Sequence, residues 1–231
     1  MASMVAVKKE LRGQIKKILS EVSDAATASQ TSNAAKTLLS LPEYKAAKRI
    51  SIYLSMPAGE ISTTPIVKDA LARGKKVFIP YTYEPSVQRE GQPKSIMDMV
   101  ELQSLKDFES LEPDKWNIPT PSKDSLASRA NSFGGKGLTD GENVETNDEN
   151  GLDLIVMPGM AFDSSFGRLG HGKGFYDYFL RRSQASSRMP FRGENYWYFL
   201  LPPSESVPMD TSDFRLDALV TGAGELRRAK V

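Results

Sequence analysis

The sequence predicts a single-domain α/β protein with an open, mostly parallel sheet and helices on both faces. Residues 49–54 and 76–80 are short and rich in β-branched residues, and they enclose a helical segment at 62–73, which is the pattern of a βαβ unit. Residues 152–157 form an almost continuous apolar run that ends at proline and glycine, as expected of a central strand buried on both faces. The length of 231 residues suits one well-cored domain, residues 1–231.

Hydrophobic periodicity predicts the remaining elements. Apolar residues recur at helical spacing in residues 5–22, 24–41 and 174–182. Pro42 is expected to end the second of these helices. Further strands are expected over residues 97–102, 196–201 and 216–221, the last two closing the sheet.

The middle of the chain is expected to contain little regular structure. Residues 116–121, WNIPTP, hold too many prolines for a helix or a strand and predict an ordered loop. Residues 122–151 are dominated by polar residues and glycine, so they bury too little apolar surface to offset the entropy of ordering. We therefore expect a flexible insertion there, and deletion of residues 123–150 should leave activity largely intact.

Composition narrows the chemistry and the partners. Thirty basic and 29 acidic side chains give a net charge of +1, which favours neither a nucleic-acid nor a membrane-surface partner. The chain has no cysteine and one histidine, His171, which leaves carboxylates, Lys and Arg as the main reactive groups. No segment has the apolar length of a membrane span. We expect a cytoplasmic protein, with a mitochondrial location as the alternative because residues 1–20 are basic.

The residues that indicate a function form a glycine-rich turn between the predicted strand 152–157 and the helix that follows. In this turn Gly167, Gly170, Gly172 and Gly174 alternate with Arg168, His171 and Lys173. Glycines let the backbone approach a ligand closely, and the N–H groups at a helix start favour a phosphate, to which the cations add positive charge. The turn therefore predicts a nucleoside triphosphate site.

Neither of two common nucleotide motifs describes this turn. Gly174 stands where a Walker A loop needs Ser or Thr to ligate magnesium, and the alternation G-x-G-x-G does not match the dinucleotide pattern. Asp177, one helical turn beyond Lys173, could hold magnesium instead. The structural alternative is that the glycines only make a tight turn and the cations are solvated. His171 is expected to contribute its backbone rather than act as a base.

Residues 157–177, MPGMAFDSSFGRLGHGKGFYD, resemble the signature of the 5-formyltetrahydrofolate cyclo-ligase family, also called methenyltetrahydrofolate synthetases, whose core reads R-L-G-x-G-x-G-[FY]-Y-D. Other stretches agree in chain order, namely residues 8–12, 50–60, 78–80, 116–119 and 214–220. The resemblance covers most of the chain except residues 122–151, and it implies a Rossmann-like α/β fold.

This resemblance implies conversion of 5-formyltetrahydrofolate to 5,10-methenyltetrahydrofolate with ATP and Mg²⁺ as cofactors and with release of ADP and phosphate. The formamide oxygen is a poor leaving group, so ATP first phosphorylates it; the neighbouring amine then attacks the activated carbon and phosphate departs. The protein must align two ligands and stabilise charge on the transferring phosphoryl group, which needs no histidine base. We expect a monomer that accepts the folate with or without a polyglutamate tail.

The family's functional positions fall on named residues of this sequence. The catalytic positions are Lys173 and Arg168. The nucleotide contacts fall on Lys8, Arg12, Arg168, Leu169, Gly170, His171, Gly172, Lys173, Gly174, Phe175 and Tyr176. The folate contacts fall on Leu54, Glu60 and Phe175, with Trp116 as a further aromatic wall, and the magnesium positions on Asp177 and Asp213.

Several of these assignments leave alternatives open. Lys8 and Arg12, at i and i+4, share a helix face that could equally be an ordinary exposed basic face. Phe175 lacks the hydroxyl of the tyrosine common at that position, and residues 196–207 depart from the family pattern. Two other functions would use the same turn: phosphate binding in a sugar-phosphate or CoA-type isomerase or transferase, and noncatalytic folate binding.

Overall fold

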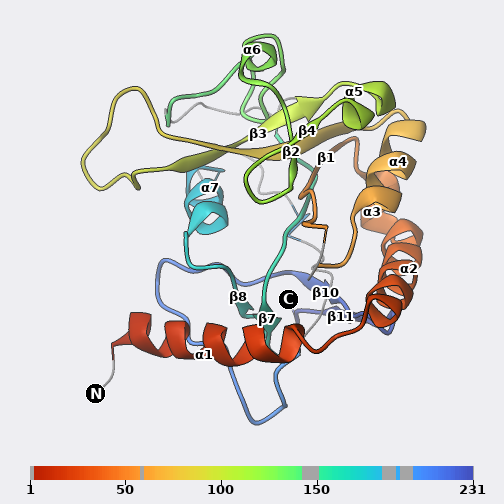
Figure 1. Ribbon diagram of the computed structural model, residues 1–231, viewed down its shortest axis with the longest axis vertical. Helices are drawn as coiled ribbons and strands as arrows, with labels where there is room; N and C mark the ends of the chain where they lie inside the picture. The colour runs from red at the N-terminus through yellow and green to blue at the C-terminus, as the bar shows by residue number, and fades with distance from the viewer. Residues whose placement is uncertain (1–2, 58–59, 142–150, 184–190, 193–199, 231) are drawn as a thin grey trace.

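The computed structural model describes residues 3–57, 60–141, 151–183, 191–192 and 200–230 (Figure 1). The helices are α1 (Met4–Leu19), α2 (Asp24–Ser40), α3 (Pro42–Ala46), α4 (Thr64–Ala72), α5 (Leu105–Glu109), α6 (Lys123–Leu126) and α7 (Phe175–Ser183). The strands are β1 (Arg49–Ile52), β2 (Lys76–Tyr83), β3 (Ile96–Leu102), β4 (Glu112–Pro113), β5 (Pro119–Thr120), β6 (Leu154–Val156), β7 (Ala161–Phe162), β8 (Arg168–Leu169), β9 (Phe191–Arg192), β10 (Ala218–Val220) and β11 (Leu226–Arg228). Among the described helices, none has the length and apolar character needed to cross a bilayer.

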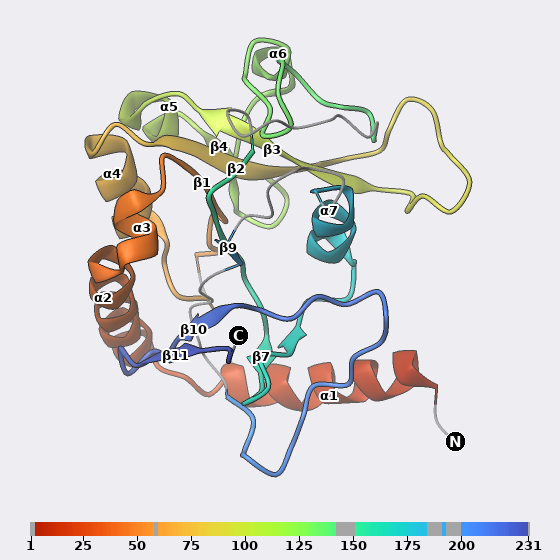
Figure 2. The ribbon, with the colours of Figure 1, turned by 180° about the vertical axis from the view of Figure 1, so that it is seen from behind.

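The central sheet has five strands in the order β3-β2-β1-β6-β9. β1 pairs in parallel with both β2 and β6, and β6 pairs in parallel with β9, which is labelled in the rear view of Figure 2. β3 is the exception: it runs antiparallel to β2 and is joined to it by a long hairpin that projects from the body at the left of Figure 1. The predicted mostly parallel sheet is confirmed, and its βαβ unit is β1, α4 and β2.

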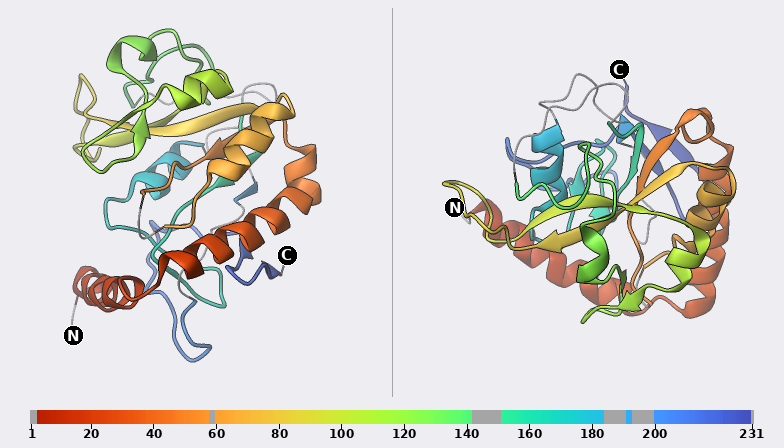
Figure 3. Two further views of the ribbon diagram at one scale, coloured as in Figure 1. Left: turned by 45° about the vertical axis from the view of Figure 1, so that its right-hand side comes forward. Right: turned by 90° about the horizontal axis from the view of Figure 1, so that it is seen from above.

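The strands contribute alternate side chains to two separate cores, because successive residues of a strand point to opposite faces. One core joins Ile50, Ile52, Val77, Ile79, Leu154 and Val156 to buried residues of α2, α3 and α4. The other core joins Phe78, Met97, Met99, Ile155 and Met157 to buried residues of α7. Helices therefore cover both faces of the sheet, as predicted, and Figure 3 shows the two groups of helices from two further directions.

The expected end of the second helix at Pro42 is confirmed, since α2 stops at Ser40. Pro42 then begins the short helix α3, because a proline in the first helical turn gives up no needed N–H group. Local predictions were wrong at two places. Pro119–Thr120 pairs with Glu112–Pro113, so the predicted loop contains a minimal strand. β10 pairs with β11 in a separate two-stranded sheet and does not close the central one. Most of the predicted strand 196–201 lies outside the described residues. Within its described part, Leu200 forms an isolated β-bridge with Phe162.

The segment that follows β5 is packed against the body. Leu126 and Phe133 are buried, and both terminal nitrogens of Arg129 donate to Asp107 of α5, at 2.6 and 2.7 Å. The expectation that residues 122–151 bury too little surface to be ordered is therefore wrong for residues 122–141, because two large apolar side chains and a buried ion pair anchor them. Residues 142–150 lie outside the described residues. Deleting the whole stretch would remove these anchors, so the expectation that it is dispensable no longer follows.

Candidate active site

The glycine-rich turn lies between β8 and α7 and meets helix α1, which passes beside β7 and β8 in Figures 1 and 2. Arg12 of α1 donates from Nε to the carbonyl of Gly170 at 2.8 Å. Gly172 has φ +92°, and a Cβ added there would lie 3.1 Å from the Arg12 guanidinium carbon. The turn therefore needs glycine for both conformation and space, and Arg12 is brought to it from 158 residues away.

Lys8, one turn before Arg12 on α1, also points inward. Its Nζ lies 2.5 Å from Asp213 Oδ2 and 3.5 Å from Asp210 Oδ2, and its side chain is only 14% exposed. The backbone N–H of Asp210 donates to the same Asp213 oxygen at 2.7 Å. The alternative of an exposed basic face is therefore wrong for Lys8, which joins α1 to the loop before β10.

Arg168 is a buried residue that forms a second ion pair in the same region. Its Nη2 donates to Asp177 Oδ2 at 2.9 Å, and its Nη1 donates to the carbonyl of Pro158 at 3.2 Å. The other oxygen of Asp177 accepts the N–H of Phe214 at 3.2 Å, which brings Asp177 to the residue that follows Asp213. The structure thus gathers both predicted magnesium residues and pairs each one with a predicted phosphate-binding cation.

The two remaining polar side chains of the turn face solvent. Lys173 is exposed, and no carboxylate among the described residues forms an ion pair with it. His171 is exposed at the rim, yet the surrounding protein desolvates its ring, and Arg168 and Arg12 repel a further positive charge. These effects hold the pKa of His171 below its ordinary value, so the side chain is neutral at pH 7. The turn therefore offers one unpaired cation, Lys173, to a bound anion.

The predicted folate residues lie on several elements. Leu54 is buried in the core beside α4, Phe175 is half-buried at the start of α7, and Trp116 is 62% exposed between β4 and β5. Of these residues, Phe175 adjoins the glycine turn directly. The Lys115 amino group lies 5.9 Å from the centroid of the Trp116 ring, and most of the side chain is open to solvent.

Glu60 and Tyr176 are polar residues whose ionisation is opposed by burial. Glu60 Oε2 accepts the N–H of Met56 at 2.9 Å, and burial raises the pKa of the Glu60 carboxyl to about 7. The hydroxyl of Tyr176 is buried without a hydrogen-bond partner among the described residues. Burial raises the pKa of that phenol. The charge of Arg168, which lies 5.4 Å from the ring centroid, lowers it, and the nearby charge of Glu60 raises it. A polar ligand group would relieve the unmet hydrogen bond.

Asp163 is a structural residue of this site that sequence reasoning missed. One of its buried carboxylate oxygens accepts the N–H groups of Ser165 and Gly167 at 2.8 and 2.9 Å, and the other accepts the N–H of Val207 at 2.8 Å. A Cβ on Gly167 would lie 2.6 Å from this carboxylate. The stretch from Asp163 to Gly167 has the composition of an Asx turn, which is the signal that could have identified it.

Comparison with known proteins decides the family. A family model described as the 5-formyltetrahydrofolate cyclo-ligase family matches residues 4–222. The chain belongs to this family. A Schizosaccharomyces pombe protein named "Probable 5-formyltetrahydrofolate cyclo-ligase" is 31% identical over 220 residues, covering 93% of this chain and 94% of the relative. The Mus musculus 5-formyltetrahydrofolate cyclo-ligase is also 31% identical, over 217 residues and 93% of each chain. The NMR structure of Aquifex aeolicus 5,10-methenyltetrahydrofolate synthetase has a similar fold, with a TM-score of 0.63 at 24% identity, covering 97% of this chain and 94% of that one.

The residues of this cyclo-ligase family member fit a magnesium nucleotide. Within the described ranges, no group of three or more His, Asp or Glu side chains is arranged to hold a metal ion. Mg²⁺ on a nucleotide normally needs only one or two protein carboxylates, because phosphates and waters supply the other ligands. Asp177 and Asp213 meet that requirement, and Arg12 brings a cationic side chain against the backbone of the turn at Gly170 and Gly172.

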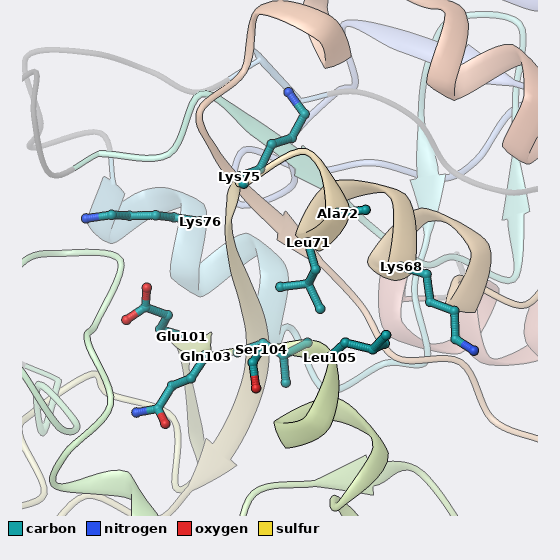
Figure 4. Close-up of a pocket in the computed structure, with 11 residues that line it drawn as sticks. Lys68, Leu71, Ala72, Lys75, Lys76, Glu101, Gln103, Ser104 and Leu105 are labelled. Carbon is teal, nitrogen blue, oxygen red and sulfur yellow. The ribbon is translucent and has the colours of Figure 1, made fainter.

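A surface pocket on another part of the cyclo-ligase fold contains none of the predicted site residues. It has a volume of about 390 Å³ and lies between α4, the start of β2, and the end of β3 with α5 (Figure 4). Lys68, Lys75 and Lys76 line it, but their amino groups point away from one another in Figure 4, and Lys75 donates to the carbonyls of Lys45 and Ala47. The pocket therefore lacks a converging set of polar groups.

The raised pKa of Glu60 predicts a measurable pH dependence of stability. The native state binds this proton more tightly than the unfolded chain, whose Glu has a pKa near 4.5. The stability that the folded state gains from the protonated Glu60 carboxyl is fully present below pH 4.5 and is lost as pH rises through about 7. Glu60→Gln should therefore flatten the change in unfolding free energy between pH 5 and 8 by about 2 kcal/mol, as measured by urea unfolding.

The matched control is Glu112→Gln, which changes an exposed glutamate on β4. It should keep the pH dependence of the unmodified protein, since an exposed carboxyl contributes little. Parallel stability curves for Glu60→Gln and the unmodified protein would contradict the prediction.

Proposed function

We propose that the protein catalyses the ATP- and Mg²⁺-dependent conversion of 5-formyltetrahydrofolate to 5,10-methenyltetrahydrofolate, with release of ADP and phosphate. The observation that supports this most is the meeting of α1, the glycine turn and the loop before β10, with its ion pairs Lys8 to Asp213 and Arg168 to Asp177. Family membership supports the same substrate and product. A cytoplasmic location and a monomeric state are further expectations.

On the nucleotide side, the basic residues have two roles, binding the phosphates of ATP and stabilising the transferring phosphoryl group. Lys8 and Arg12 of α1 hold phosphates of ATP against the backbone of the turn, from Leu169 to Tyr176. Lys173, which has no ion pair among the described residues, and Arg168 stabilise the negative charge on the phosphoryl group as it moves to the formyl oxygen. When bound, Mg²⁺ would be held by Asp177 and Asp213 and would neutralise phosphate charge.

On the folate side, the protein orients the substrate and excludes water. Leu54 and Phe175 supply apolar surface, and Trp116 supplies a ring for stacking. Glu60, with its pKa near 7, accepts or donates a hydrogen bond to the polar edge of the folate. Ring closure is intramolecular, so holding the amine beside the activated carbon is the main task of this half of the site.

The test is absorbance in the methenyl-folate band with purified protein and 5-formyltetrahydrofolate, with and without ATP and magnesium. An increase that requires both is expected. Conversion without ATP hydrolysis, or folate binding with no conversion under any condition, would contradict the proposal and favour phosphate-only chemistry or a noncatalytic binder.

Gly172→Ala tests the close approach of the turn to Arg12. The new Cβ would adopt a strained φ and press on the guanidinium, so the KM for ATP should rise about tenfold, from a cost of 1 to 2 kcal/mol. Gly91→Ala is the matched control: its φ is +73° and nothing lies within 4 Å, so it shares the backbone strain without the contact. Equal KM values for ATP in the two variants would count against the role of this approach.

A further inference from the structure

A buried polar network connects helix α7 to strand β3 and to the segment after α6. At its centre is Asp98 of β3, which is 0% exposed. Its carboxylate accepts hydrogen bonds from Arg182 at 2.8 Å, the N–H of Thr139 at 2.7 Å, the Tyr83 hydroxyl at 3.0 Å and the Asn131 amide at 3.2 Å. Three separate segments, β2, residues 131–139 and α7, therefore converge on one carboxylate of β3.

Arg182 joins this network to the last turn of α7. Its side chain is 4% exposed, and besides Asp98 it donates to the hydroxyl of Thr139. The guanidinium also stacks on the ring of Phe133 at 4.6 Å, and that ring packs against Phe179 of α7 at 5.0 Å between centroids. The carboxyl-terminal half of α7 is thus clamped by residues 131–139 as well as by β3.

The other end of the same helix belongs to the candidate active site. α7 has nine residues and begins directly after Lys173 and Gly174, and its first turn contains Asp177. Asp177 holds Arg168 and the backbone of Phe214. Because so short a helix behaves as one rigid piece about 13 Å long, the orientation fixed at Arg182 also fixes the groups at its start.

We propose that Arg182 and Asp98 form a positioning pair that orients α7, and so places Lys173 and Asp177 for the phosphoryl transfer assigned under the proposed function. A buried ion pair contributes little net stability compared with apolar residues of the same volume, but it strongly favours one geometry. Bonds to several segments at once make that geometry unique. Residues 131–139, which bind this pair, are therefore part of the support of the active site.

Arg182→Lys tests this with the charge retained, because lysine lacks the planar fork that reaches Asp98 and Thr139 together. We expect kcat to fall about 10- to 100-fold and the KM for ATP to rise, with a smaller change in the KM for folate, as for a displacement of about 1 Å. Thr139→Val removes the hydroxyl that accepts from Arg182 but keeps the other bonds of Arg182, so it should lower kcat by only about threefold to tenfold.

Arg129→Lys is the matched control. Arg129 is as buried as Arg182, with 4% of its side chain exposed, but its partner Asp107 lies on α5 and not on α7. Its melting temperature should fall about as much as that of Arg182→Lys, whereas its kcat at 25 °C should stay within about twofold of the unmodified protein. Unchanged kcat in Arg182→Lys, or equal losses in the two variants, would overturn the proposal.

The unmodified protein is assayed first, which separates this proposal from the function on which it rests. If it forms no methenyl product, the proposed function fails, and calorimetric binding of ADP with Mg²⁺ then decides the positioning role. Weaker binding in Arg182→Lys than in Arg129→Lys supports it. Equal binding, or no binding to the unmodified protein, overturns it.

Discussion

Lys173→Ala is expected to lower kcat by about 100-fold or more while changing the dissociation constant of the folate by less than about threefold. Lys173 is exposed on the glycine turn and no carboxylate of the described chain neutralises it, so its charge is available to the transferring phosphoryl group. It makes no hydrogen bond within the described structure, so the variant should keep its melting temperature. Initial rates and equilibrium binding of 5-formyltetrahydrofolate measure the two effects separately.

Lys94→Ala is a suitable control, since this lysine lies on the β2–β3 hairpin with 84% of its side chain exposed. It should leave both kcat and folate binding unchanged. If Lys173→Ala weakened folate binding as much as it lowered kcat, the lysine would act in general binding and not on the phosphoryl group.

Arg168→Met should be damaging in two ways. Among the described residues it leaves the carboxylate of Asp177 with only the N–H of Phe214, so the free energy of unfolding should fall by about 3 kcal/mol, as when one partner of a buried ion pair is removed. It also removes a charge next to the transferred group, so kcat should fall by about 1,000-fold. Urea unfolding and the methenyl-folate assay measure the two losses.

The double variant Arg168→Met with Asp177→Asn separates these effects. Stability should be partly restored because no unpaired charge remains, whereas activity should not return. Strictly additive losses of stability would mean that the two side chains do not interact. Arg227→Met is the control: its ion pair with Glu225 is exposed, so stability should change by less than about 1 kcal/mol.

The sequence was most informative about the sheet. Alternation and buried runs predicted β1, β2, β3 and β6, because the repeat of two residues in a strand is a local property. Pairing is not local, which explains the error over β10: the run at 216–221 reads as a strand, but nothing in it specifies β11 as the partner. Asp98 illustrates the same limit, since its place in an alternating strand is visible but its four partners come from distant segments.

The sequence predicted the glycine turn of the candidate site better than it predicted the contacts between distant segments. The glycine turn with Arg168 and Lys173 could be inferred from the residues themselves, because glycine and charge at a helix start have a direct physical meaning. The position of Lys8 against Asp213 could not, since α1 alone is an ordinary basic amphipathic helix. Only the family resemblance assigned each of these residues to the site, Lys8 to the nucleotide and Asp213 to magnesium, and the structure brings the two together.

The order of strands has a consequence for how the chain is made. β1 lies between β2 and β6, so one of its edges pairs early and the other waits for residues 154–156. The hydrogen bond that aligns this edge, from the N–H of Arg49 to Asp153, spans 104 residues. Until the ribosome has released that far segment, the growing chain presents an unpaired parallel edge to other chains. Aggregation during synthesis should therefore be greatest for fragments that end between β3 and β6.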